Sequence, residues 1–135
     1  MALSSQDALV YIMVVTSAAD MEISAVELDR IGSLIERLPV FKDYSRERLA
    51  DMASDCVDLM RKVEDLNKIL DITLDILPDR LHDTAYALAV EIAAVDLELE
   101  QSELRWLEMM RDRLNLSRLT TAAIEASAKA RLRKA

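Results

Sequence analysis

The sequence contains very few of the residues that build tight turns and loops. Its 135 residues include one Gly and two Pro, which leaves no material for glycine-rich phosphate loops, tight β-hairpins or flexible linkers. The P-loop and the Rossmann nucleotide-binding fingerprint each need several closely spaced glycines. Both motifs are therefore excluded.

Cysteine and histidine are as scarce as glycine. Cys56 is the only cysteine and cannot form an internal disulfide, so nothing in the chain requires an oxidising compartment. We interpret it as a small buried hydrophobe. His82, the only histidine, has no Cys or His neighbours at ligand spacing and does not suggest zinc. We expect it to be partly exposed.

The chain also lacks a long apolar run and an excess of positive charge. The apolar run from Ala8 to Val15 is far shorter than the roughly 20 residues that span a bilayer. Asp7 interrupts its start, where a signal peptide would be cationic. We therefore expect a cytoplasmic protein without a membrane span. The net charge of −8 disfavours nucleic acid, whose phosphates are bound by Lys and Arg.

The residues that are present predict a single all-α domain over residues 1–135. Hydrophobic residues make up 52% of the chain and charged residues 31%, enough to bury a core and to cover it with a solvated surface. Apolar residues recur at steps of three and four, and no alternation with a period of two persists. Ser24, Ser45 and Ser117 predict helix starts, and Pro39 and Pro78 predict helix ends.

Two segments are apolar on almost every side, Leu9–Ala19 and Thr84–Val95. Helices of this kind lie at the centre of a fold, so we predict about seven helices with these two packed against each other. Glu91 lies inside the second segment, where an ionised carboxylate needs a partner. An arginine is the favoured partner, and a contribution to a polar site between two halves of the molecule is the alternative.

Other residues are assigned packing or surface roles. We interpret Gly32 as a point of close backbone approach between helices, and Trp106 and Met110 as core or interface residues. A basic stretch near the end of the chain is interpreted as a complement to the dipole of a last helix. It consists of Lys129, Arg131, Arg133 and Lys134.

The two halves of the chain repeat one another at an offset of 76 residues. Residues 8–38 match residues 84–114, and each copy is a buried helix, an acidic Asp-x-Glu turn and an amphipathic helix with a Glu in its first turn. Because neither helix pair can bury its apolar face alone, we predict a pseudo-symmetric packing of two repeats. The identical pairs are Ala18 and Ala94, Asp20 and Asp96, Glu22 and Glu98, Glu27 and Glu103, Leu28 and Leu104, Arg37 and Arg113, and Leu38 and Leu114.

The repeated turns resemble the tellurite-resistance TerB family. The residues that carry the likeness run from Ala18 to Ser24 with Glu27, and from Ala93 to Leu99 with Glu103. They are also similar to the N-terminal region of a membrane-anchored J-domain co-chaperone. The resemblance implies a TerB-like helical bundle linked to tellurite resistance or a wider chemical-stress response, with acidic residues that bind metal.

The chain departs from the family pattern at one position of each turn. The family has Gly after the Asp, and Met21 and Leu97 stand there in this chain. Because side chains disfavour the left-handed backbone that Gly permits, this difference argues against a left-handed conformation at the turn.

The acidic residues of the two turns form the candidate site. The C-terminal dipole of a buried helix disfavours the carboxylates of Asp20 and Asp96, so a cation, an arginine or a proton must relieve them. Three converging carboxylates suit calcium or magnesium. The candidate metal ligands are Asp20, Glu22 and Glu27 in the first turn, and Asp96, Glu98 and Glu103 in the second. The alternative is that these residues are caps and ion pairs, as in the capping box that Glu27 can form with Ser24.

The sequence favours a non-catalytic function. It has no nucleophile-and-base constellation and no cofactor loop, so a carboxylate-dependent enzyme is the least favoured hypothesis. We expect a binding and stress-response module whose acidic turns engage a divalent cation or a protein partner. A helical oligomerisation or protein-interaction domain without metal, such as a homodimer, is the alternative.

Overall fold

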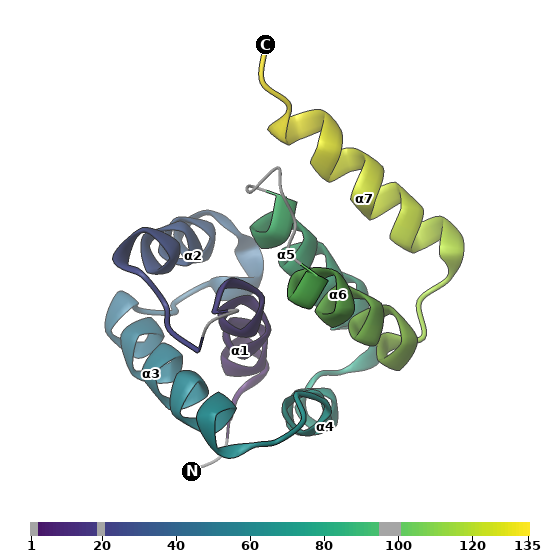
Figure 1. The fold of residues 1–135 in the computed structure, drawn as a ribbon. Helices are drawn as coiled ribbons and strands as arrows, with labels where there is room; N and C mark the ends of the chain where they lie inside the picture. The colour runs from purple at the N-terminus through teal and green to yellow at the C-terminus, as the bar shows by residue number, and fades with distance from the viewer. Residues whose placement is uncertain (1–2, 19–20, 95–100) are drawn as a thin grey trace.

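The fold consists of α-helices throughout the part of the chain described by a computed structural model, residues 3–18, 21–94 and 101–135. Within these residues there are seven α-helices, two short 3-10 helices and no strand (Figure 1). The predicted all-α class and the predicted number of helices are therefore confirmed. The α-helices are α1 (Ser5–Ser17), α2 (Ala25–Arg37), α3 (Arg46–Lys62), α4 (Asn67–Ile76), α5 (His82–Ala94), α6 (Gln101–Leu114) and α7 (Arg118–Leu132), and the 3-10 helices are η1 (Pro39–Phe41) and η2 (Asp79–Leu81).

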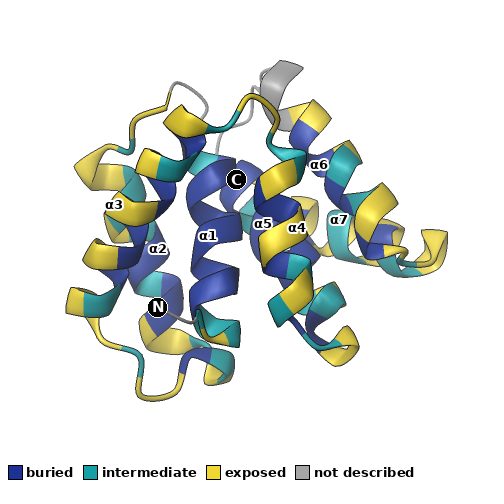
Figure 2. Cartoon of the chain, turned by 90° about the horizontal axis from the view of Figure 1, so that it is seen from below, coloured by how far each residue is buried: buried dark blue, intermediate teal, exposed yellow. Residues whose placement is uncertain are grey.

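Helices α1 and α5 lie side by side at the centre of the molecule and are its most deeply buried elements (Figure 2). Every residue from Ala8 to Val15 is at most 6% exposed. Helices α2, α3 and α4 pack on α1, whereas α6 and α7 pack on α5. The prediction that the two apolar segments form a central pair is confirmed, because only contact on all sides removes so much apolar surface from water.

Helices α2, α3 and α7 start directly after the predicted capping residues Ser24, Ser45 and Ser117. The Ser24 hydroxyl accepts from the amide of Glu27 at 3.1 Å, and the Glu27 carboxylate accepts from the amide of Ser24 at 3.0 Å. The Ser45 hydroxyl accepts from the amide of Arg48 and caps α3, and the Ser117 hydroxyl accepts from the amide of Thr120 and caps α7. Helices α2 and α4 end just before Pro39 and Pro78, as predicted.

Helix α1 begins at Ser5, four residues before the predicted start at Leu9. Ser4 and Asp7 form a second capping box, in which each side chain accepts from the other residue's amide at 3.0 and 2.9 Å. The start was predicted from the apolar pattern, which begins only after the polar residues of the first turn, Ser5, Gln6 and Asp7. A capping box determines the start independently of that pattern.

The core also accounts for Cys56, Trp106 and Met110. Cys56 and Met110 are fully buried and Trp106 is 2% exposed, which confirms Cys56 as a buried hydrophobe and the other two as core residues. The Trp106 indole donates to the Thr16 hydroxyl at 2.9 Å, and that hydroxyl donates to the Ile12 carbonyl at 2.7 Å. This chain of hydrogen bonds ties α6 to α1 without leaving a buried polar atom unsatisfied.

Gly32 lies under a side chain of α3, and the three atoms nearest to a Cβ placed there all belong to the guanidinium of Arg46. The close approach of helix backbones at Gly32 stays a prediction. A Cβ at Gly32 would lie 2.5 Å from Nη1 of Arg46. The Arg46 guanidinium is held over the glycine by Asp29 at 3.0 Å and by Glu36 at 2.8 Å. The absence of a Cβ leaves room for this arginine at the start of α3.

The two halves share a plan, since each central helix packs against the amphipathic helix that follows it, α1 against α2 and α5 against α6. Their surroundings differ, because α3 and α4 cover α1 whereas α7 covers α5 (Figure 1). The superposition of residues 8–38 on residues 84–114 stays a prediction. Among the described residues, none of the helices combines the length and hydropathy needed to cross a membrane.

Candidate functional site

The first acidic turn has a left-handed residue at its centre. Met21 has a φ of 66°, so the prediction that a residue other than Gly argues against a left-handed backbone was wrong. This conformation costs a residue with a Cβ roughly 1–2 kcal/mol. Two hydrogen bonds hold it, one from the Met21 amide to the Ala18 carbonyl at 3.0 Å and one from Arg61 to the Met21 carbonyl at 3.0 Å. Leu97, the corresponding residue of the second turn, lies outside the described residues.

Two of the three candidate ligands in the first turn are described. Glu22 is exposed beside Met21, and Glu27 accepts from Ser24 in the capping box of α2. One Glu27 oxygen is therefore engaged in the capping role that the sequence offered as an alternative to metal binding. Asp20 lies outside the described residues, so the convergence of the three carboxylates stays a prediction.

The second acidic turn falls almost wholly outside the described part of the chain. Asp96, Glu98 and the side chain of Glu103 are not among the described residues. Within the described residues, no group of three or more His, Cys, Asp or Glu side chains could hold a metal ion. That search does not reach four of the six candidate ligands, so their role stays a prediction.

Glu91 has the arginine partner that the sequence favoured. Its carboxylate lies 2.8 Å from Nη1 of Arg131 in the last turn of α7, and its side chain is 19% exposed. This contact raises the pKa of Arg131. Arg131, interpreted from the sequence as a complement to a helix dipole, thus also joins the end of α7 to the central helix α5.

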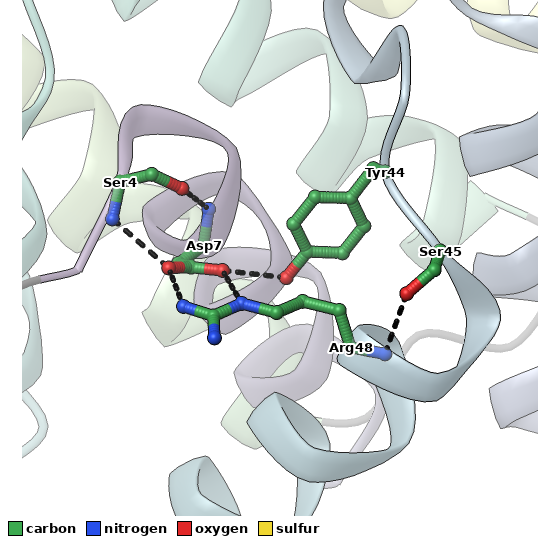
Figure 3. Close-up of polar contacts among 5 residues, drawn as sticks. All are labelled: Ser4, Asp7, Tyr44, Ser45 and Arg48. Carbon is green, nitrogen blue, oxygen red and sulfur yellow. Dashed lines mark hydrogen bonds and ion pairs between the residues drawn. The ribbon is translucent and has the colours of Figure 1, made fainter.

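A buried carboxylate at Asp7 joins α1 to α3 (Figure 3). The Asp7 side chain is fully buried and accepts from Arg48 through two nitrogens, Nε at 3.1 Å and Nη2 at 2.7 Å. The Tyr44 hydroxyl donates to it at 2.6 Å and the Ser4 amide at 2.9 Å. With four donors around two oxygens, the carboxylate is fully satisfied.

The electrostatics of Asp7 suit a structural role. Burial raises its pKa, but the donors Arg48, Ser4 and Tyr44 lower it more, and the pKa falls from 3.8 to about 2. Burial and the Asp7 carboxylate raise the pKa of Tyr44. A carboxylate with so low a pKa and with all its acceptor sites occupied is a poor general base at neutral pH. Asp7 therefore anchors α1 to α3.

The sequence contained a signal for this centre that the capping assignments missed. Ser4 and Asp7 have the three-residue spacing of a capping box ahead of an apolar run, and Asp7 was weighed only as an interruption of that run. Tyr44 and Arg48 lie 37 and 41 residues further along the chain. No local pattern connects them to Asp7.

A cavity of about 200 Å³ lies among α5, α6 and α7. One end is polar, because the buried Tyr86 hydroxyl donates to Glu125 at 3.0 Å and Nη1 of Arg111 lies 3.8 Å from the same oxygen of Glu125. Sequence reasoning did not find this cavity, since three helices must pack to enclose it. The apolar lining residues are Val90, Ala93, Ala94, Leu104, Leu107 and Ala128.

His82 lies at the start of α5 and is partly exposed, as expected, with a side chain that is 18% exposed. Its Nε2 is buried without a hydrogen-bond partner and lies 3.8 Å from a carboxylate oxygen of Asp79. The described residues place no second histidine or cysteine beside it to form a metal site.

Comparison of the chain with models of known families, with curated proteins and with solved structures finds no match. The likeness to the TerB family therefore rests on the residues of the two acidic turns. A function drawn from that likeness is a proposal.

Proposed function

We propose that this chain is a non-catalytic, TerB-like binding module, and that its acidic turns bind a divalent cation in a response to tellurite or other chemical stress. The proposed ligands are Asp20, Glu22 and Glu27 in the first turn, and Asp96, Glu98 and Glu103 in the second. Carboxylate oxygens are hard ligands, so calcium or magnesium is the proposed ion.

The observation that carries the proposal is the left-handed backbone of Met21. The turn keeps the conformation that Gly would permit in the family pattern, although a residue with a Cβ pays a conformational penalty there. Strained backbone persists where the surrounding structure over-determines it, and such positions cluster at binding and switch sites. The strain lies one residue after Asp20 and one before Glu22.

A non-catalytic role is favoured because arginines engage the carboxylates of the two central helices, Asp7 in α1 and Glu91 in α5. Asp7 is saturated with donors and has a pKa of about 2, and Glu91 is paired with Arg131. Asp7 therefore lacks the raised pKa that a general acid needs near neutral pH, and the Glu91 carboxylate is held by its arginine.

Thermal unfolding in the presence of metal tests the cation proposal. We would follow circular dichroism at 222 nm in millimolar calcium, in magnesium and in chelator, for the wild type and for Asp20→Asn and Asp96→Asn. A metal that binds only the folded state, at about 100 times its dissociation constant, stabilises it by about 2.7 kcal/mol. The melting midpoint should then rise by several degrees.

The matched control is Asp51→Asn, which removes one carboxylate from the exposed surface of α3. This variant should keep the full metal-dependent rise, whereas the variant of the occupied turn should lose it. Equal midpoints of the wild type in metal and in chelator would overturn the cation proposal. A rise that survives both turn variants would show general screening of the negative charge, and would overturn it as well.

A further inference from the structure

The cavity among α5, α6 and α7 is lined in part by small residues. Ala93 and Ala94 of α5 and Ala128 of α7 line it, and a methyl group fills less space than a larger side chain would. An unfilled apolar cavity reduces stability. An apolar cavity with a few convergent polar groups is also the usual form of a small-molecule site.

Among the described residues that line the cavity, the charges at its edge are balanced. Glu108 and Glu125 supply two carboxylates, and Arg111 and Lys129 supply two cations. A charged ligand would meet a like charge at this edge, which costs more in a partly desolvated site than in water. The balance therefore favours an uncharged ligand.

The polar end of the cavity fits a hydroxyl group. Nη1 of Arg111 and Oε2 of Glu125 lie 3.8 Å apart, which is beyond hydrogen-bond distance. Oε2 already accepts from the buried Tyr86 hydroxyl at 3.0 Å. A ligand hydroxyl is both a donor and an acceptor, so it can accept from Arg111 and donate to the Glu125 carboxylate. A carboxylate ligand lacks the donor, and an ammonium ligand lacks the acceptor.

The volume limits the apolar body of the ligand. An apolar cavity of about 150 Å³ holds one benzene molecule, and this cavity measures about 200 Å³. A six-membered ring with a short alkyl chain, or an aliphatic chain of similar size, therefore fits this volume.

We propose that this cavity binds a small neutral amphiphile, an alcohol or a phenol, with its hydroxyl between Arg111 and Glu125 and its apolar body against Val90, Leu107 and Ala128. The site is separate from the cation proposal and does not depend on it. Either proposal can fail while the other stands.

Titration of the full chain with four matched probes tests this site. The probes are 4-ethylphenol, ethylbenzene, 4-ethylbenzoate and 4-ethylbenzylammonium, and the readout is the shift of backbone amide resonances in nitrogen-15 NMR spectra. We expect 4-ethylphenol to shift the amides around Val90, Leu107 and Ala128 saturably. The other three probes should bind at least tenfold more weakly. Absence of a saturable shift, or equal affinity for the four probes, would overturn the proposal.

Two substitutions locate the site. Ala128→Leu fills the cavity and should weaken 4-ethylphenol binding at least tenfold, whereas Ala126→Leu makes the same change on the exposed surface of α7 and should leave the affinity unchanged. Arg111→Met keeps the apolar lining, removes the donor, and should reduce the affinity for 4-ethylphenol to that for ethylbenzene. Because Arg111→Met does not add volume, it tests the site even where Ala128→Leu disturbs folding. Unchanged affinity in Arg111→Met would contradict the hydroxyl contact.

Discussion

Replacing Asp7 by Asn tests whether the buried carboxylate anchors α1 to α3. The substitution keeps the shape of the side chain and removes its charge, so the guanidinium of Arg48 loses its ionic partner while Tyr44 loses its strongest acceptor. Removing one partner of a buried ion pair costs about 3–5 kcal/mol. The Arg48 side chain is 39% exposed and can be rehydrated. We therefore expect a loss of unfolding free energy near the lower end of this range, about 3 kcal/mol at pH 7.

The same anchor predicts how the difference in unfolding free energy between wild type and Asp7→Asn depends on pH. The pKa of Asp7 is lower in the folded chain, at about 2, than its ordinary value of 3.8, so the unfolded chain binds the proton more tightly. The stability from the carboxylate is therefore fully present above about pH 4 and is lost as the pH falls toward 2. The interval between the two pKa values corresponds to about 2 kcal/mol. The difference between wild type and Asp7→Asn should then shrink from about 3 to about 1 kcal/mol.

Urea unfolding followed by circular dichroism at several pH values between 7 and 2 measures both effects. With a slope of about 2 kcal/mol per molar urea, the midpoint of Asp7→Asn should lie roughly 1.5 M below that of the wild type at pH 7. Asp51→Asn, on the exposed surface of α3, controls for the loss of one negative charge. The reasoning is refuted if Asp7→Asn loses no more stability than this control. It is also refuted if the difference from wild type stays constant down to pH 2.

Two further substitutions test single contacts. Met21→Gly should raise the unfolding free energy by about 1 kcal/mol and the melting midpoint by about 3 °C, because Gly adopts the left-handed backbone without penalty. Met21→Ala keeps a Cβ and should not stabilise the fold. Equal melting midpoints for the two variants would contradict backbone strain at Met21. Arg131→Met should lower the unfolding free energy by about 1 kcal/mol through loss of the contact with Glu91, whereas Arg133→Met should leave it unchanged. A double-mutant cycle with Glu91→Gln measures the coupling, and a coupling of zero would show that the ion pair contributes nothing.

Much of the fold was predictable because its signals are local. A capping box lies within four residues, as at Ser24 and Glu27, so its hydrogen bonds can be read directly from the spacing. The need of Glu91 for a cation was equally evident, because an apolar helix cannot leave an ionised carboxylate unpaired. The sequence did not show which arginine would pair with Glu91. Arg131 lies 40 residues away, on a helix whose direction depends on packing against α5.

The candidate site was less accessible to prediction. The conformation of Met21 was predicted wrongly, because local preference alone disfavours a left-handed backbone at a residue with a Cβ. Arg61 overrides that preference from α3, 40 residues further along the chain. The convergence of the acidic side chains concerns residues such as Asp20 and Asp96 that lie outside the described part of the chain, so it stays a prediction.

The sequence by itself determined that this protein is helical, where α2, α3 and α7 begin, where α2 and α4 end, and that two apolar helices lie at its centre. These properties depend on hydrogen bonds between near neighbours and on apolar periodicity, both of which are contained in short stretches of chain. Only the tertiary structure decided that Asp7 meets Tyr44 and Arg48, and that residues of α5, α6 and α7 line a common cavity. Neither feature is contained in a short stretch of chain, because the relative placement of packed helices determines both.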